Sequence, residues 1–176
     1  LAGFIVYGMD AAAIRGLLER VVVLTPQVRR RATQVAQAFV APQTTAQDCF
    51  ALLEHAAAHW ADSRTFDSSI AQAGRLARGR PFPQVVAVVD RVERLQGGGN
   101  PGSIVEESSH LVRPDLATDD LVTLVDIFEE LTYPDRSICR TRTLEAVTGA
   151  MPPPEFMALV RGIAAFLSRH REAEAR

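Results

Sequence analysis

Apolar residues recur at helical spacing in one segment after another, and proline or glycine ends most of these segments. Residues 10–24, 28–39, 66–78 and 118–131 each carry apolar side chains three or four positions apart. This period is typical of an α-helix with one buried face, whereas a half-buried strand alternates every second residue. Thr25 before Pro26 predicts the cap and the first turn of the second of these helices. The pattern therefore predicts an all-α protein, an irregular helical bundle of about seven or eight helices.

Two apolar segments leave an alternative open. Residues 3–8 and residues 84–89 are short and apolar, and the second is rich in valine, which favours sheets. If both were strands, the chain would form a small α/β domain. The apolar spacing over residues 84–96 fits a helix better and continues beyond the length of a typical strand.

The last predicted helix spans residues 154–171 and has a wide apolar stripe. We expect it to bury Phe156, Leu159, Val160, Ile163, Phe166 and Leu167.

A glycine-rich stretch, GGGNPGS at residues 97–103, is the clearest interruption of the helical pattern. Its composition predicts a flexible connector rather than a phosphate-binding loop, because no lysine follows it and the preceding segment is helical. A chain of 176 residues has the size of one domain. We therefore expect a single helical domain, 1–176, which can divide into two helical subassemblies, 1–96 and 104–176.

All nineteen basic residues are arginine, and the chain contains no lysine. This excludes a Walker A phosphate loop, a protein-kinase site and Schiff-base chemistry, because each of these needs a lysine side chain. The same bias, with abundant alanine and valine, indicates a GC-rich genome. The net charge of −2 creates no global field that would favour nucleic acid or an anionic membrane.

The N-terminal residues 1–9 form an apolar run that is too short to cross a bilayer. Three interpretations stay open: a buried first segment, the end of a membrane span, or residues upstream of a true start at Met9. We expect a soluble, cytoplasmic protein without a transmembrane span.

Two histidines, His55 and His59, stand four residues apart in the predicted helix that Thr44 and Gln47 would cap. Helical geometry places them on a polar face, away from Phe50, Leu53, Ala57 and Trp60. We favour a solvated face. The alternative is a divalent metal site, because histidines at i and i+4 can bind one ion.

Such a metal site would need further ligands. His110 and Glu107 are the candidates, since their spacing matches the Glu-x-x-His motif of di-iron bundles. Only one such motif is found in the chain, and the glutamate that follows the first histidine in zinc-protease helices is replaced by Ala56. We therefore predict no cofactor, with a divalent metal as the alternative.

Charge is segregated along the chain and indicates surfaces for partners. Residues 81–135 carry eleven acids against three arginines, whereas the flanking blocks are mildly basic. Asp119 and Asp120, after the predicted cap Thr118, begin an amphipathic helix that ends near Glu129 and Glu130. The densest basic run is Arg29, Arg30 and Arg31.

These features favour a non-enzymatic helical module that binds a protein partner or forms a homo-oligomer. The acidic helix and the three consecutive arginines are the candidate contact residues. A metal-binding helical enzyme or sensor is the first alternative. A nucleic-acid-associated regulator that uses the arginines is a weaker one, because the basic footprint is local and aromatic residues are scarce.

Overall fold

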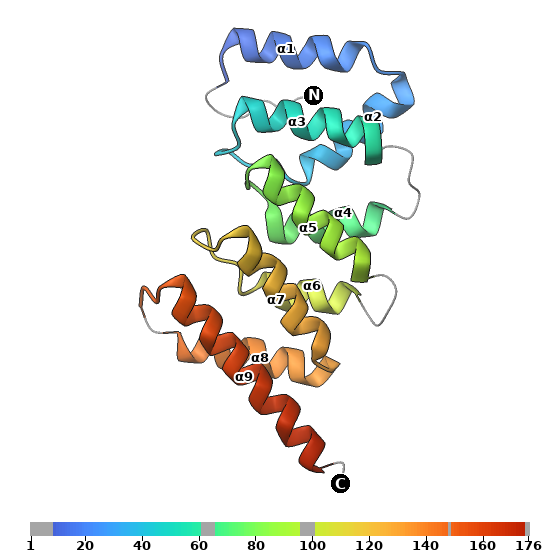
Figure 1. Ribbon diagram of the computed structural model, residues 1–176. Helices are drawn as coiled ribbons and strands as arrows, with labels where there is room; N and C mark the ends of the chain where they lie inside the picture. Colours follow the sequence, from blue (N-terminus) through green and yellow to red (C-terminus); the bar gives the residue numbers. More distant parts are fainter. Residues whose placement is uncertain (1–8, 61–65, 96–100, 148, 175–176) are drawn as a thin grey trace. The chain divides into compact units, whose positions relative to one another are not determined.

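The computed structural model describes residues 9–60, 66–95, 101–147 and 149–174, and it is all-α over these residues (Figure 1). Nine α-helices, rather than seven or eight, lie within these ranges, and no strand does. They are α1 (Ala11–Val22), α2 (Pro26–Gln37), α3 (Ala46–His55), α4 (Phe66–Ala77), α5 (Phe82–Arg94), α6 (Pro101–Ser109), α7 (Thr118–Glu130), α8 (Tyr133–Ala146) and α9 (Pro153–Glu174). A π-helical segment, Ala56–Trp60, continues α3. The predicted fold class is confirmed.

The α/β alternative is wrong at its second strand. Residues 84–89 lie inside α5, where Val85, Val88, Val89 and Val92 are buried at helical spacing. These valines are compatible with a helix, because they lie on one helical face and that face packs on the core. The first proposed strand, residues 3–8, lies outside the described residues.

The chain comprises two compact units, residues 1–93 and 94–176. The boundary lies at the end of α5, a few residues before the predicted connector. Of that connector, residues 101–103 begin α6, and residues 97–100 lie outside the described residues. The single domain over residues 1–176 stays a prediction.

In the first unit, α3 packs against both α1 and α2, and α2 also contacts α4 and the π-helical segment. Thr25 caps α2 as predicted, its hydroxyl accepting from the Val28 amide at 3.4 Å, with Pro26 at the first helical position. The core of the unit includes Phe39 and Trp60, whose ring centroids lie 6.0 Å apart.

The cap of α3 is displaced by one residue from the predicted Thr44–Gln47 pair. Thr45 is the N-cap and accepts from the Asp48 amide at 3.1 Å, while the Thr45 hydroxyl donates to the Asp48 carboxylate at 2.6 Å. Thr44 is buried and accepts from the Ala41 amide instead. Asp48 also accepts from the Phe82 amide at 2.8 Å, which fixes the start of α5 beside α3.

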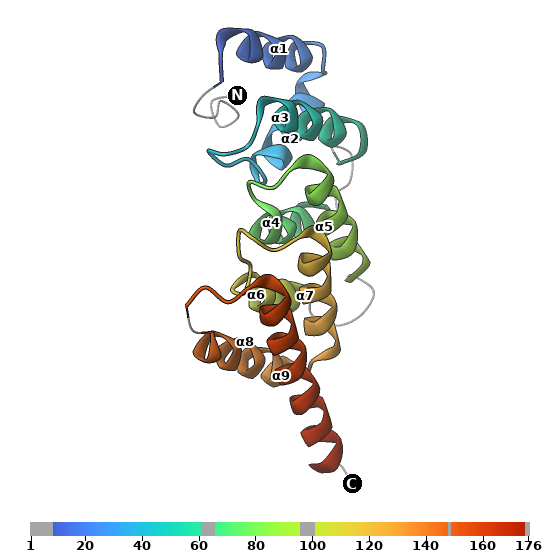
Figure 2. The same ribbon diagram turned by 60° about the vertical axis from the view of Figure 1, so that its left-hand side comes forward.

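In the second unit, two helical hairpins stack on each other. α6 packs on α7 and α8 packs on α9, while α6 contacts α8 and α7 contacts α9 across the hairpins (Figure 2). Helical-repeat proteins use this arrangement, in which each hairpin buries apolar surface against its neighbour. Each hairpin therefore needs a second hairpin to cover its apolar face.

One buried arginine joins α7 to α8. Arg136 is 7% exposed, and its Nε donates to the Phe128 carbonyl oxygen at 2.7 Å. That carbonyl lies in the last turn of α7, where backbone acceptors have no partner within the helix. Burial lowers the pKa of Arg136, and the nearby Glu107 and Glu129 oppose this shift.

Candidate interaction surface

The outer side of the α8–α9 hairpin carries an open apolar groove of about 760 Å³. Its lining consists of Ile138, Arg142, Glu145 and Ala146 from α8 and Leu159, Gly162, Ile163, Phe166 and Leu167 from α9. Ile138 is 43% exposed and Phe166 is 59% exposed. Large apolar side chains gathered in one exposed groove are typical of a surface that binds another protein.

The sequence of α9 explains why the groove exists. The buried residues of α9 include Phe156, Met157, Val160 and Ala164, which share one face. At about 100° per residue, the groove-lining residues Leu159, Ile163, Phe166 and Leu167 centre roughly 90° away from that face. The helix thus carries a second apolar surface beside the one that packs on α7 and α8.

This observation corrects the prediction for the last helix. Phe156 and Val160 are buried, and Leu159, Ile163 and Leu167 are half-buried. Phe166 is exposed, and its ring is tilted against that of His170, with centroids 5.8 Å apart. The width of the apolar stripe was the signal for the groove, since a helix that buries one face needs a narrower stripe. The contribution of Ile138 from α8 could not be found from the period alone.

One charged pair borders the groove. Arg142 Nη1 lies 3.0 Å from Glu145 Oε2, and both side chains are more than half exposed. An exposed pair of this kind contributes little to stability. It leaves both signs of charge at the rim, where a docking partner can meet either of them.

The predicted metal ligands His55 and His59 lie side by side, with ring centroids 4.5 Å apart. His55 is not on a fully solvated face, because its ring meets Trp60 at 4.6 Å and Phe82 at 5.4 Å, both edge to face. His59 is exposed. The favoured solvated face is therefore wrong for His55, since α5 brings Phe82 against it.

The other proposed ligands belong to the second unit. Glu107 in α6 lies 3.3 Å from Arg140 Nε, and its side chain is only 14% exposed. His110 is exposed in the turn after α6. Across the described ranges, no group of three or more His, Cys, Asp or Glu side chains could hold a metal ion. A metal site stays a prediction that no described geometry supports.

The predicted basic contact run is partly used inside the first unit. Arg29 Nη2 donates to the carbonyl oxygens of Val22 at 3.1 Å and Leu24 at 3.0 Å, and so satisfies acceptors at the end of α1. Arg30 is exposed, and Arg31 is half-buried. The three arginines therefore do not form one free basic patch.

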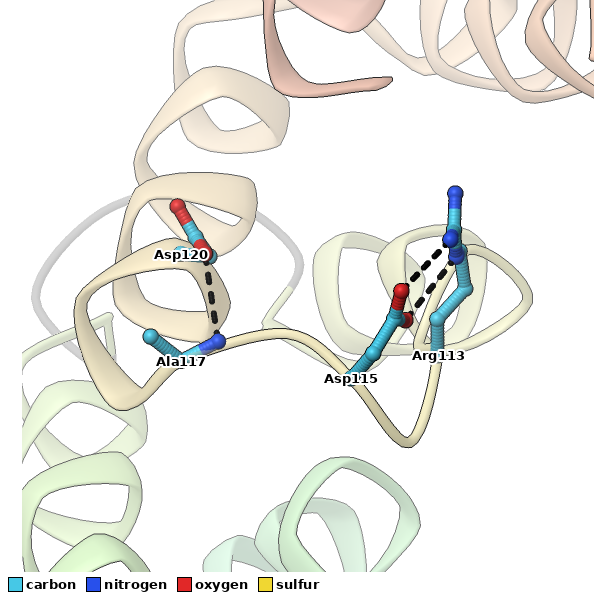
Figure 3. A network of polar contacts seen from close by, with 4 residues as sticks. All are labelled: Arg113, Asp115, Ala117 and Asp120. Carbon is cyan, nitrogen blue, oxygen red and sulfur yellow. Dashed lines mark hydrogen bonds and ion pairs between the residues drawn. The ribbon is translucent and has the colours of Figure 1, made fainter. Parts of the chain in front are cut away.

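The predicted acidic contact residues lie at the two ends of α7. Asp120 accepts from the Ala117 amide at 3.1 Å, next to an Arg113–Asp115 pair with a contact of 2.6 Å (Figure 3). Ala117, not the predicted Thr118, is the N-cap. Asp119 is exposed beside this cap, and acids in the first turn stabilise a helix through its dipole.

At the other end of α7, Glu129 and Glu130 are both exposed. Glu130 also lines a second groove, of about 530 Å³, between α7 and α9. Asp119, Glu129 and Glu130 are thus exposed, whereas Asp120 is half-buried in the cap of α7, and the four acids are divided between the two ends of the helix.

The environment of His55 predicts a pH-dependent stability. Burial lowers the pKa of His55, the neighbouring His59 lowers it further, and Asp90 opposes the shift. The unfolded chain then takes up the proton first, so stability is present above pH about 6.5 and is lost as the pH falls below that value. We expect urea midpoints to decrease from about pH 7.5 to 5.5, and His55→Phe to weaken this decrease.

His110→Gln is the matched control, because that histidine is exposed and lies in the other unit. It should retain the wild-type pH dependence. A His55→Phe profile as steep as that of the wild type would show that another group is responsible.

The chain matches no protein-family model, no curated protein and no solved structure. Within the described residues, no helix is long and apolar enough to cross a membrane. The α8–α9 groove therefore provides the main argument about function.

Proposed function

We propose that the protein is a non-enzymatic helical interaction module that binds an amphipathic helix in its α8–α9 groove. The observation that carries this proposal is the exposed apolar lining from two adjacent helices, with Ile138 on one side and Phe166 on the other. Apolar residues at positions i, i+3, i+4 and i+7 of a docking helix fit such a groove.

The stacked hairpins of the second unit support the same proposal. α8 and α9 already bury one side against α6 and α7 in helix-to-helix contacts. The groove lies beside that packing and presents the same kinds of side chain. The groove therefore offers a docking helix the same kind of apolar contact that α8 and α9 already make with α6 and α7.

Selection from a library of displayed helical peptides tests the proposal. We expect the selected peptides to carry apolar anchors at i, i+3 or i+4 and i+7. We expect Ile138→Glu to weaken their binding at least about tenfold, because it places a charge among apolar contacts. Fluorescence anisotropy with purified protein measures the affinities.

Leu18→Glu is the matched control, since Leu18 in α1 has the same 43% exposure as Ile138 but lies in the first unit. It should bind the peptides like the wild type. Failure to select any helical peptide, or equal binding by Ile138→Glu, would contradict the proposal.

A further inference from the structure

The outer surface of α9 carries a row of small residues between the two grooves of the second unit. Ala158, Gly162 and Ala165 are all exposed along this ridge. A Cβ added to Gly162 would meet no heavy atom within 4 Å. Glycine inside a helix is destabilising relative to alanine. The packing of the described residues does not require a glycine at this position, whereas close approach by another helix would.

Charges are placed symmetrically about that glycine. Glu155 stands seven residues before Gly162, and Arg169 stands seven residues after it. Seven residues are about two turns, so all three lie on one side of the helix. Both charged residues are exposed. If two α9 helices cross antiparallel at Gly162, each Glu155 faces Arg169 of the second copy.

Side-chain sizes follow the same symmetry. Phe166 is four residues after Gly162, and Ala158 is four residues before it; Leu159 is three before, and Ala165 is three after. The antiparallel crossing therefore places each large side chain opposite an alanine. Helices whose contact residues are small can approach to about 8 Å.

We propose that α9 pairs with α9 of a second copy of this chain, antiparallel about Gly162, along the edge of the α8–α9 groove that Leu159, Gly162 and Phe166 form. This inference rests on the proposed function, and it names the partner helix. Two-fold pairing requires a surface that complements itself. The α9 surface is complementary to itself in charge, because Glu155 faces Arg169 of the second copy. It is also complementary in side-chain size, because Phe166 and Leu159 each face an alanine.

Charge-reversal variants test the register of the pairing by analytical ultracentrifugation. The wild type should self-associate at micromolar concentrations. Glu155→Arg alone places two arginines opposite each other, and Arg169→Glu alone places two glutamates opposite each other. The dissociation constant of each single variant should therefore be at least about tenfold higher than that of the wild type. An equimolar mixture of the two should associate again, because the mixed pair has opposite charges at both contacts.

Glu106→Arg in α6 and Arg15→Glu in α1 are matched controls, since both residues are exposed and lie outside α9. They should self-associate like the wild type, and circular dichroism should show every variant folded. Monomeric wild type, unchanged single variants or a mixture that stays monomeric would overturn the inference.

The peptide experiment separates this inference from the proposed function. Selected peptides should compete with self-association if both are correct. A monomeric wild type that still binds the peptides through Ile138 would overturn the second copy as partner and leave the groove as a helix-binding site.

Discussion

Replacing Arg136 with alanine is expected to lower the free energy of unfolding by about 2–3 kcal/mol, because it removes the charged donor of a buried hydrogen bond. The change leaves the Phe128 carbonyl without its donor at 2.7 Å. It also removes the positive charge that lies near Glu107 and Glu129. Urea unfolding followed by far-ultraviolet circular dichroism gives the free energy.

Two controls separate the causes of this loss. Arg136→Met keeps the apolar stem, so a loss close to that of alanine would assign the effect to the charge and the hydrogen bond. Arg142→Ala removes an arginine whose side chain is 69% exposed. It should cost no more than about 0.5 kcal/mol. An Arg136→Ala variant as stable as Arg142→Ala would show that the buried contact contributes nothing.

Replacing Phe39 with alanine is the second large effect, and we expect a loss of about 3–5 kcal/mol. Phe39 is 0% exposed, and its ring lies 6.0 Å from that of Trp60. Its carbonyl oxygen accepts from the Gly79 amide at 2.7 Å, so the backbone around the cavity is held in place. A site that cannot collapse keeps most of the cavity, which raises the cost.

The chain has one tryptophan, so the intrinsic fluorescence of Trp60 reports this substitution directly. Tyr133→Ala is the matched control, because that aromatic side chain is 68% exposed and does not line the groove. It should change stability by less than about 1 kcal/mol. Equal losses for the two variants would contradict the assignment of Phe39 to the core.

Features of the fold that depend on a single segment of the chain could be predicted from the sequence. Thr25 before Pro26 predicted the start of α2, and the valine spacing predicted α5 over a strand. The cap of α3 was displaced because Thr44 and Thr45 are chemically alike. Only the burial of Thr44 and the contact of Asp48 with the Phe82 amide distinguish the two.

The candidate surface could be predicted less well, because it depends on contacts between segments. The period of α9 showed too many apolar residues for one face, but it could not show which of them the neighbouring helices leave exposed. The predicted solvent exposure of His55 was wrong for the same reason, because Phe82, which covers its ring, comes from a segment 27 residues later. Residue types alone could not show that Arg29 is used in capping α1.

Each of the two units contains one buried cysteine, whose reaction with a thiol reagent reports when that unit opens. Cys49 and Cys139 are both free and 0% exposed, and one lies in each unit. Burial raises the pKa of each thiol to about 11, so neither presents a reactive thiolate near neutral pH. A thiol reagent can therefore modify each sulfur only when its surroundings open. The labelling rates of the two peptides would record how often each half of the chain exposes its interior.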